Sequence, residues 1–272
     1  MRLPRADAGF SRRRGGTRPQ RRTQERPHST ESVMELKDKV AVVTGASAGL
    51  GRAFAQSLAA EGMRVYGLAR RSARLDELGR EIGPAFRGLV CDVTNERDVA
   101  STFETIQREA GRVDVLVANA GLGKFAPITD VTTDDLDVQL ATNVRGLMLT
   151  VRAAVPMMKA QNAKDGFGGH VVTIASVAGL VGNANLSVYN ATKFAVRGLS
   201  EALMKELRGD GIKVTCFYPG SIATEFADVA GTTLKGEPMQ PEDLAATLVH
   251  VLNGPDRYLI SEVVMRPLRP AA

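Results

Sequence analysis

The sequence contains few of the residues that build disulfide frameworks and metal sites. Among 272 residues there are two cysteines, Cys91 and Cys216, which lie far apart in or at the end of apolar runs. This placement favours buried thiols in a reducing compartment, so a cytoplasmic protein without a disulfide is predicted. The three histidines, His28, His170 and His250, are isolated along the chain, and no metal site is predicted from them.

Long uninterrupted apolar runs are also missing. Arg145 and Arg152 break the most apolar stretch, so no membrane-spanning helix is predicted. The net charge is +5, but residues 1–33 hold nine arginines against three carboxylates, which is +6 locally. The rest of the chain therefore carries −1, and a basic groove for nucleic acid is not implied for the folded part.

Residues 1–33 lack the apolar side chains that a packed core requires, because Arg, Gly and Pro dominate them. We interpret them as a disordered basic extension or as sequence upstream of a true start at Met34. Neither a secretory signal nor a transit peptide fits, since an apolar region is missing and Gly and Pro oppose an amphipathic helix. Nucleic-acid binding by these arginines is the alternative. Residues 34–272 show no repeat and no linker, so one domain is predicted.

From residue 39 onwards, short β-branched runs alternate with stretches of helical periodicity. Strands that alternate with helices pair in parallel through right-handed crossovers, with helices on both faces. The predicted fold is therefore α/β, a doubly wound Rossmann fold with one seven-stranded parallel sheet. Strands are expected at 39–45, 64–70, 86–93, 114–118, 170–176, 212–218 and 257–265, and helices at 50–61, 73–82, 96–110, 134–161, 187–207 and 241–252.

The predicted helix 187–207 contains Tyr189 and Lys193, which are four residues apart and share one face. Such a pair is most often an ordinary helix face. A free phenol titrates near ~10, and a neighbouring ammonium favours the phenolate. We therefore expect Lys193 to lower the pKa of Tyr189 toward neutrality, which would make the pair an acid–base group.

A glycine-rich segment, TGASAGLG at residues 44–51, joins the first predicted strand to the first predicted helix. Its Gly-x-x-x-Gly-x-Gly spacing differs from the commoner dinucleotide fingerprint, and a plain tight turn is the alternative reading. Glycines here allow a pyrophosphate to approach the helix N-terminus. At the end of the second predicted strand, Arg70 and Arg71 stand where an acidic residue would select NAD. Two guanidiniums instead favour the phosphate of NADP(H), unless they are ordinary surface charges.

These motifs, with others further along, resemble the short-chain dehydrogenases/reductases from about Leu36 to the C-terminal region. TGASAGLG is followed in order by NAG at 119–121, by Asn143 in the long predicted helix, and by Ser176 with YNATK at 189–193. A Pro-Gly pair, Pro219 and Gly220, follows the sixth predicted strand. The agreement in order and spacing is what makes the resemblance specific.

The resemblance implies a role for each catalytic residue. Tyr189 is the general acid that protonates the carbonyl oxygen during reduction, and Lys193 lowers its pKa and binds the nicotinamide ribose. Ser176 steadies the carbonyl oxygen, and Asn143 holds a water of the proton relay. Each role is consistent with hydride arriving from the cofactor while charge develops on oxygen.

The resemblance also implies which residues bind NADP. Asp92 and Val93 flank the adenine, Asn119 supports the strand beside the cofactor, and Ile222 and Thr224 contact the carboxamide. Position 48 is Ala rather than a basic residue, which leaves Arg70 and Arg71 as the NADP determinants. The remaining implied contacts are Gly45, Ser47, Ala48, Gly49, Leu50, Gly51, Ala120, Gly121, Pro219 and Gly220, together with Tyr189 and Lys193.

Residues 223–236 are read as a mobile lid over the substrate. The family arrangement implies an apolar pocket, so a hydrophobic carbonyl or alcohol substrate (a ketone, an aldehyde or a 3-hydroxy acid) is expected. Lys124 or Arg145 is the alternative for holding a carboxylate. Two other functions stay open: a 3-oxoacyl-thioester reductase acting on an acyl carrier, and a non-catalytic NADP sensor or scaffold. The implied lining residues are Phe125, Ala126, Val177, Leu180, Val181 and Phe226.

The two long predicted helices, 134–161 and 187–207, carry more apolar residues than one sheet face needs. In the family, such helices pair across a two-fold axis. A homodimer or homotetramer is therefore expected. The apolar residues in question are Leu147, Val151, Val155, Met158, Phe194 and Leu203.

Overall fold

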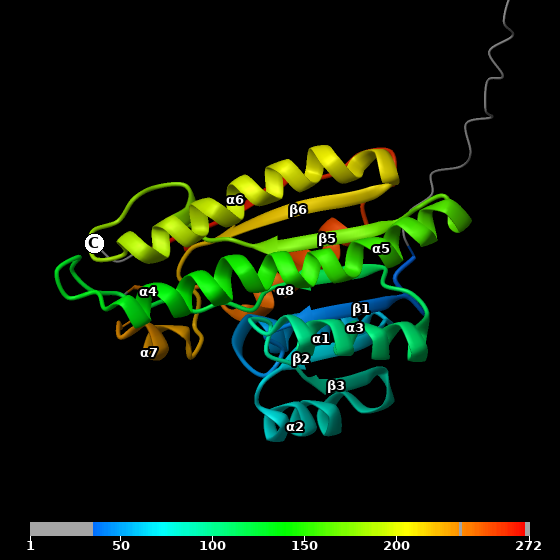
Figure 1. Cartoon of the computed structure of the whole chain (residues 1–272), viewed down its shortest axis with the longest axis horizontal. Coiled ribbons are helices and arrows are strands. Elements are labelled where there is room, and N and C mark those ends of the chain that lie inside the picture. The colour runs from blue at the N-terminus through cyan, green and yellow to red at the C-terminus, as the bar shows by residue number, and fades with distance from the viewer. Residues whose placement is uncertain (1–34, 234–235, 270–272) are drawn as a thin grey trace, which may run out of the picture. The chain divides into compact units, whose positions relative to one another are not determined.

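The computed structural model describes residues 35–233 and 236–269, so the predicted extension 1–33 lies outside the described residues. Seven strands form one parallel sheet in the order β3-β2-β1-β4-β5-β6-β7 (Figure 1). The predicted doubly wound α/β fold is therefore confirmed. The strands are β1 Val40–Thr44, β2 Arg64–Ala69, β3 Phe86–Val90, β4 Val115–Ala118, β5 Gly169–Ile174, β6 Ile212–Pro219 and β7 Glu262–Met265.

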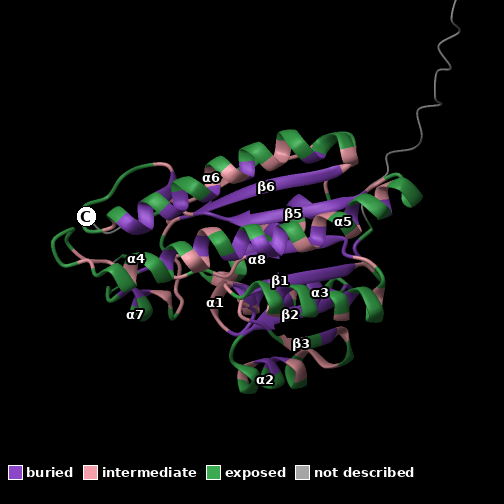
Figure 2. Ribbon diagram, in the orientation of Figure 1, coloured by how far each residue is buried: buried purple, intermediate pink, exposed green. Residues whose placement is uncertain are grey.

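Helices cover both faces of the sheet, and the central strands between them are fully buried (Figure 2). On one face, Phe54, Leu58 and Leu248 pack with side chains from β1, β4 and β5. On the other face, in front in Figure 1, Ile106 and Met158 belong to a second buried cluster. The helices are α1 Gly49–Ala60, α2 Ser72–Ile82 and α8 Pro241–Leu252 on the first face, and α3 Glu96–Ala110, α5 Leu147–Asp165 and α6 Ser187–Leu207 on the second.

Two strands, β3 and β7, are shorter than predicted by three or more residues. β3 ends at Val90 because the Asp92 carboxylate accepts hydrogen bonds from the backbone N–H and the hydroxyl of Thr94, which turns the chain. β7 begins at Glu262 rather than at residue 257. The chain before it is held in a turn by Lys213 Nζ, which donates to the carbonyls of Gly254 and Pro255.

The predicted helix 134–161 is interrupted. It consists of α4 Thr133–Leu140, a π-helical segment Ala141–Gly146, and then α5. A π-helical turn inserts an extra residue into the helix and is frequent at functional sites. This turn contains Asn143, which the sequence had singled out.

The segment after β6, which was predicted to be a mobile lid, contains local secondary structure. It includes the short helix α7 Phe226–Ala230, and Ala223 N donates to Met239 O at 2.9 Å. α7 and α4 lie together at one end of the molecule, where the carboxyl ends of the strands point (Figure 1). Residues 234–235 of the predicted lid lie outside the described residues. Within the described ranges, no helix has the length and apolar composition to cross a membrane.

Candidate active site

The turn between β1 and α1 has the geometry of an anion site. A Cβ added at Gly51 would lie 2.2 Å from the Gly45 carbonyl oxygen, so only glycine fits there. Gly45 itself has a φ of +70°. Among the described residues, no side chain caps α1 at Ala48 and no acidic residue lies in its first turn. The N–H groups at this helix terminus are therefore free to bind a phosphate.

Asn119 and Ala120, which follow β4, are tied to the end of β1. The Thr44 hydroxyl accepts from Asn119 N at 3.0 Å and from Ala120 N at 2.9 Å, and Asn119 Nδ2 donates to Thr44 O at 2.9 Å. No individual role was predicted for Thr44. Its place at the end of β1, directly before Gly45, is the signal that could have identified it as a positioning residue.

Asn143 joins three elements of the site. Its Nδ2 donates to Leu122 O at 2.8 Å and to Thr192 Oγ1 at 3.0 Å, and its Oδ1 accepts from Leu122 N at 2.9 Å. The side chain is buried, so these bonds hold the chain after β4 against α6. A Cβ on Gly121 would lie 3.2 Å from Asn143 Oδ1. The water-holding role of Asn143 stays a prediction.

Ser176, Tyr189 and Lys193 come together at the carboxyl end of β5. Ser176 Oγ donates to Pro219 O at 3.3 Å and accepts from Ala178 N, as the cap of a short 3-10 turn. Lys193 Nζ donates to Ile174 O at 2.8 Å and lies 5.6 Å from the centroid of the Tyr189 ring. Both Tyr189 and Lys193 are buried.

The titration of this pair differs from the sequence expectation. Burial raises the pKa of Tyr189 above its ordinary value, and a hydrogen bond with Ser176 opposes that rise. Burial also lowers the pKa of Lys193 to about 8. The pKa of Tyr189 is therefore not brought toward neutrality in this structure, because loss of solvent outweighs the stabilisation of the phenolate by an ammonium that is bonded to a carbonyl.

Two phenylalanines from distant segments enclose the Tyr189 ring. The centroids of Phe125 and Phe226 lie 5.3 Å and 5.7 Å from that of Tyr189. Phe226 is the first residue of α7, and Phe125 N donates to Ala230 O at the other end of α7. These contacts contribute to the burial that raises the tyrosine pKa. Of the other predicted lining residues, Val181 is half exposed, and Ala126, Val177 and Leu180 are intermediate.

Asn190, which the sequence analysis passed over, shapes the same region. Its Nδ2 donates to Ala178 O at 2.6 Å and to Val181 O at 2.8 Å, and its Oδ1 accepts from Asn183 N. It therefore fixes the loop that carries the predicted substrate contacts. Its position beside Tyr189 in YNATK was the available signal.

Arg71, one of the two arginines predicted to bind the phosphate, lies at the predicted phosphate site. Arg74, for which no role was predicted, lies there with it. Arg71 Nη2 donates to Ser47 Oγ at 3.1 Å, which ties it to the glycine-rich turn. Arg74, one helical turn further along, forms two 2.7 Å bonds with the Glu225 carboxylate. Arg70 is exposed. Arg74 could have been found from its three-residue spacing to Arg71 at the start of α2.

The remaining predicted coenzyme contacts lie along the same edge of the sheet. Cys91 N donates to Ala69 O, so Asp92 and Val93 follow directly beside the end of β2. Gly220 N donates to Met265 O at 2.8 Å. Ile222 pairs with Met239, and a Cβ on Gly49 would touch Thr224 at 3.2 Å. The structure places these residues but leaves their roles as predictions.

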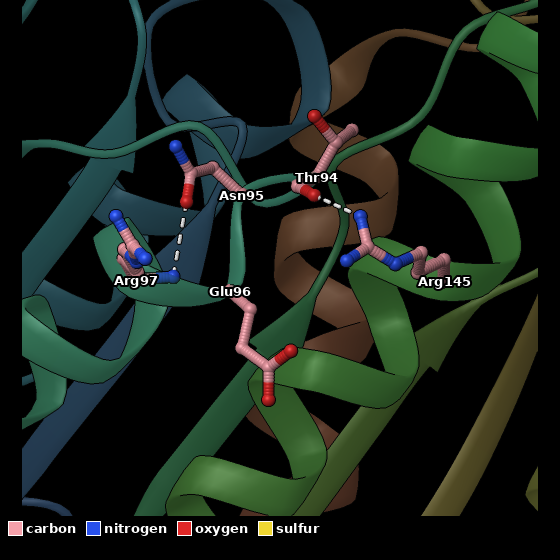
Figure 3. Close-up of a pocket in the computed structure, with 5 residues that line it drawn as sticks. All are labelled: Thr94, Asn95, Glu96, Arg97 and Arg145. Atoms are coloured by element: carbon pink, nitrogen blue, oxygen red, sulfur yellow. Dashed lines mark hydrogen bonds between the residues drawn. The ribbon is translucent and has the colours of Figure 1, made fainter.

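A hollow of about 630 Å³ opens elsewhere on the surface, between the start of α3 and the π-helical segment (Figure 3). There the Arg145 guanidinium donates to the Thr94 carbonyl. Arg145 is therefore engaged away from the substrate side, which removes it as the partner of a substrate carboxylate. The lining residues are Thr94, Asn95, Glu96, Arg97 and Arg145.

Comparisons with known proteins agree with this arrangement. Residues 39–234 match the family model of the short chain dehydrogenases. An uncharacterized oxidoreductase of Staphylococcus saprophyticus is 33% identical over 242 residues, covering 87% of this chain and all of the relative.

Two solved structures are each 30% identical to the chain. The 3-ketoacyl-(acyl-carrier-protein) reductase of Brucella melitensis, complexed with NADH, has a TM-score of 0.79, covering 85% of this chain and 98% of that one. A closed form of serine dehydrogenase complexed with NADP+ has a TM-score of 0.77, covering 83% and 94%. The chain therefore belongs to the short-chain dehydrogenase family of oxidoreductases.

Proposed function

We propose that this oxidoreductase transfers hydride between NADP(H) and the carbonyl or alcohol carbon of an apolar ketone, aldehyde or 3-hydroxy acid. The observation that carries the proposal is the cluster of Ser176 with the buried Tyr189 and Lys193, at the sheet edge that also holds the glycine-rich turn. A proton donor beside a dinucleotide site is what carbonyl reduction requires.

The residues at the sheet edge fit a dinucleotide with a phosphorylated ribose. Gly45 to Gly51 leave the start of α1 open to a pyrophosphate, and Arg71 and Arg74 lie beside this turn. When bound, the coenzyme supplies or accepts the hydride. Similar proteins are described with NADH and with NADP+, so the choice of NADP rests on these two arginines.

The protein's own residues handle the proton. Because the pKa of Tyr189 is raised, its hydroxyl stays protonated across the neutral range and can donate to a carbonyl oxygen. Ser176 provides a second hydroxyl beside it, and the Lys193 ammonium stabilises the phenolate that forms when the proton leaves. The Asn143 side chain bonds the backbone of Leu122 and the hydroxyl of Thr192, and so fixes the chain beside these groups.

Phe125 and Phe226 favour an apolar substrate, because a charged group against these rings would lose its hydration without gaining a partner. The second candidate, a 3-oxoacyl-thioester reductase, is supported by the similarity to the Brucella reductase. A spectrophotometric screen of aldehydes, ketones, 3-hydroxy acids and 3-oxoacyl thioesters, each with NADPH and with NADH, tests both. Turnover of thioesters alone would favour the second candidate. If none of these compounds were turned over, the proposed activity would be refuted in favour of a non-catalytic NADP sensor or scaffold.

Coenzyme choice gives a direct test of the arginines. Replacing Arg71 and Arg74 with Ala should weaken NADPH binding about ten- to hundredfold, the worth of one strong charge-assisted contact, and leave NADH binding unchanged. Titration of protein fluorescence or calorimetry measures both constants. Arg87→Ala, which removes an exposed arginine paired with Glu109, is the control. A wild-type protein that prefers NADH would refute the assignment.

Self-association is the second proposal. Three of the apolar residues on which this prediction was based are not available to a partner, because Leu147, Val151 and Met158 are buried against the protein's own sheet. Phe194 on α6 and Met148 on α5 remain 42% and 52% exposed, and large exposed apolar side chains on long helices suit a subunit interface.

Sedimentation at several concentrations should therefore give the mass of a dimer or tetramer. Phe194→Glu should shift this mass toward the monomer, because a buried carboxylate at the interface would be unpaired. Leu268→Glu, at a 93% exposed position, should leave it unchanged. A wild-type protein that sediments as a monomer at all concentrations would contradict the proposal.

A further inference from the structure

Glu225 is paired with Arg71 and Arg74, the two arginines that the proposed function assigns to the coenzyme phosphate. Its carboxylate forms two 2.7 Å bonds with Arg74 Nη1 and lies 3.6 Å from Arg71 Nη1. Arg71 in turn donates to Ser47 in the glycine-rich turn. Glu225 precedes α7 in the chain after β6, whereas both arginines lie at the start of α2.

The residues on either side of Glu225 contact two other parts of the site. Thr224 packs against Gly49, where an added Cβ would meet it at 3.2 Å. Phe226 packs against the Tyr189 ring at 5.7 Å between centroids. Residues 224–226 therefore connect the pyrophosphate turn, the arginine pair and the proton donor within three consecutive positions.

A carboxylate and a phosphate monoester use the same guanidinium N–H groups. The side chains of Arg71, Arg74 and Glu225 are 49%, 39% and 53% exposed, so an incoming anion can reach them. An exposed ion pair is weak, which makes exchange for a more highly charged group favourable. Hydrogen bonds from Arg74 lower the pKa of Glu225, so its carboxylate is ionised across the neutral range.

We infer that Glu225 is a specificity-determining residue, whose carboxylate competes with the 2′-phosphate of NADP(H) for Arg71 and Arg74. This inference rests on the proposed NADP-dependent function.

The test compares Glu225→Gln with the wild-type protein. Removing the competing charge while keeping the side chain's size should tighten NADPH binding about three- to tenfold and leave NADH binding unchanged. The matched control is Glu237→Gln, because Glu237 is an exposed carboxylate in the same connection and pairs with Arg269 at 3.5 Å. Equal or weaker NADPH binding by Glu225→Gln would overturn the inference, since Glu225 would then position the arginines. A wild-type protein that binds neither nucleotide would instead refute the proposed function.

Discussion

The Tyr189→Phe protein is expected to bind NADPH normally and to reduce carbonyl substrates about two to four orders of magnitude more slowly, the usual worth of general acid catalysis. The substitution keeps the ring that packs against Phe125 and Phe226 and removes only the hydroxyl. The hydroxyl that is removed is hydrogen-bonded with Ser176, and loss of one such bond costs only about 1 kcal/mol, so the fold should not be strongly destabilised. Single-turnover reduction and NADPH titration measure the two effects separately.

Tyr66→Phe is the matched control for this experiment. Tyr66 is also fully buried, and its hydroxyl donates to Glu109 at 3.2 Å, in a part of the sheet away from the catalytic cluster. Its loss should leave turnover unchanged. Near wild-type turnover by Tyr189→Phe would remove the proposed mechanism.

The second large effect is a fall in the reduction rate as the pH rises through about 8. Burial lowers the pKa of Lys193 from 10.5 to about 8, so its ammonium is present below that pH and lost above it. The neutral amine no longer stabilises a phenolate on Tyr189, and the rate should fall by up to about tenfold per pH unit. A pH–rate profile for reduction at saturating NADPH measures this.

Stability should change in the opposite direction. The folded pKa of Lys193 lies below its unfolded value, so the unfolded chain binds more protons between pH 8 and 10.5. This group therefore makes the free energy of unfolding rise with pH across that range. Urea unfolding at pH 7 and pH 9.5 separates loss of activity from loss of fold.

Substitution at Lys193 identifies the group that titrates. Lys193→Met should be slow at every pH and lose the fall near pH 8, and Lys193→Arg should recover part of the rate, because a planar guanidinium stays charged but fits differently. Lys213→Met is the control, since Lys213 is another buried lysine bonded to carbonyls. If the fall near pH 8 disappeared in Lys213→Met and persisted in Lys193→Met, the assignment to Lys193 would be refuted.

Local pattern in the sequence determined much of the fold. The predicted bounds of α3, α6 and α8 agree with the structure, because their apolar periodicity, and the N-terminal caps of α3 and α8, are properties of neighbouring residues. The alternation of strands and helices was enough to predict the parallel sheet. The spacing of Tyr189 and Lys193 likewise placed them on one helical face.

Only the tertiary structure decided how these groups behave. Glu225 meets Arg74 across 151 positions of sequence, and Phe125 and Phe226 reach Tyr189 from separate segments. Periodicity describes which face of an element is buried but not which distant side chain covers it. The raised tyrosine pKa depends on that covering, since desolvation is a property of the assembled site. The sequence by itself therefore determined the family, the sheet and the paired residues, whereas long-range packing decided the protonation of Tyr189 and the carboxylate that holds the arginines.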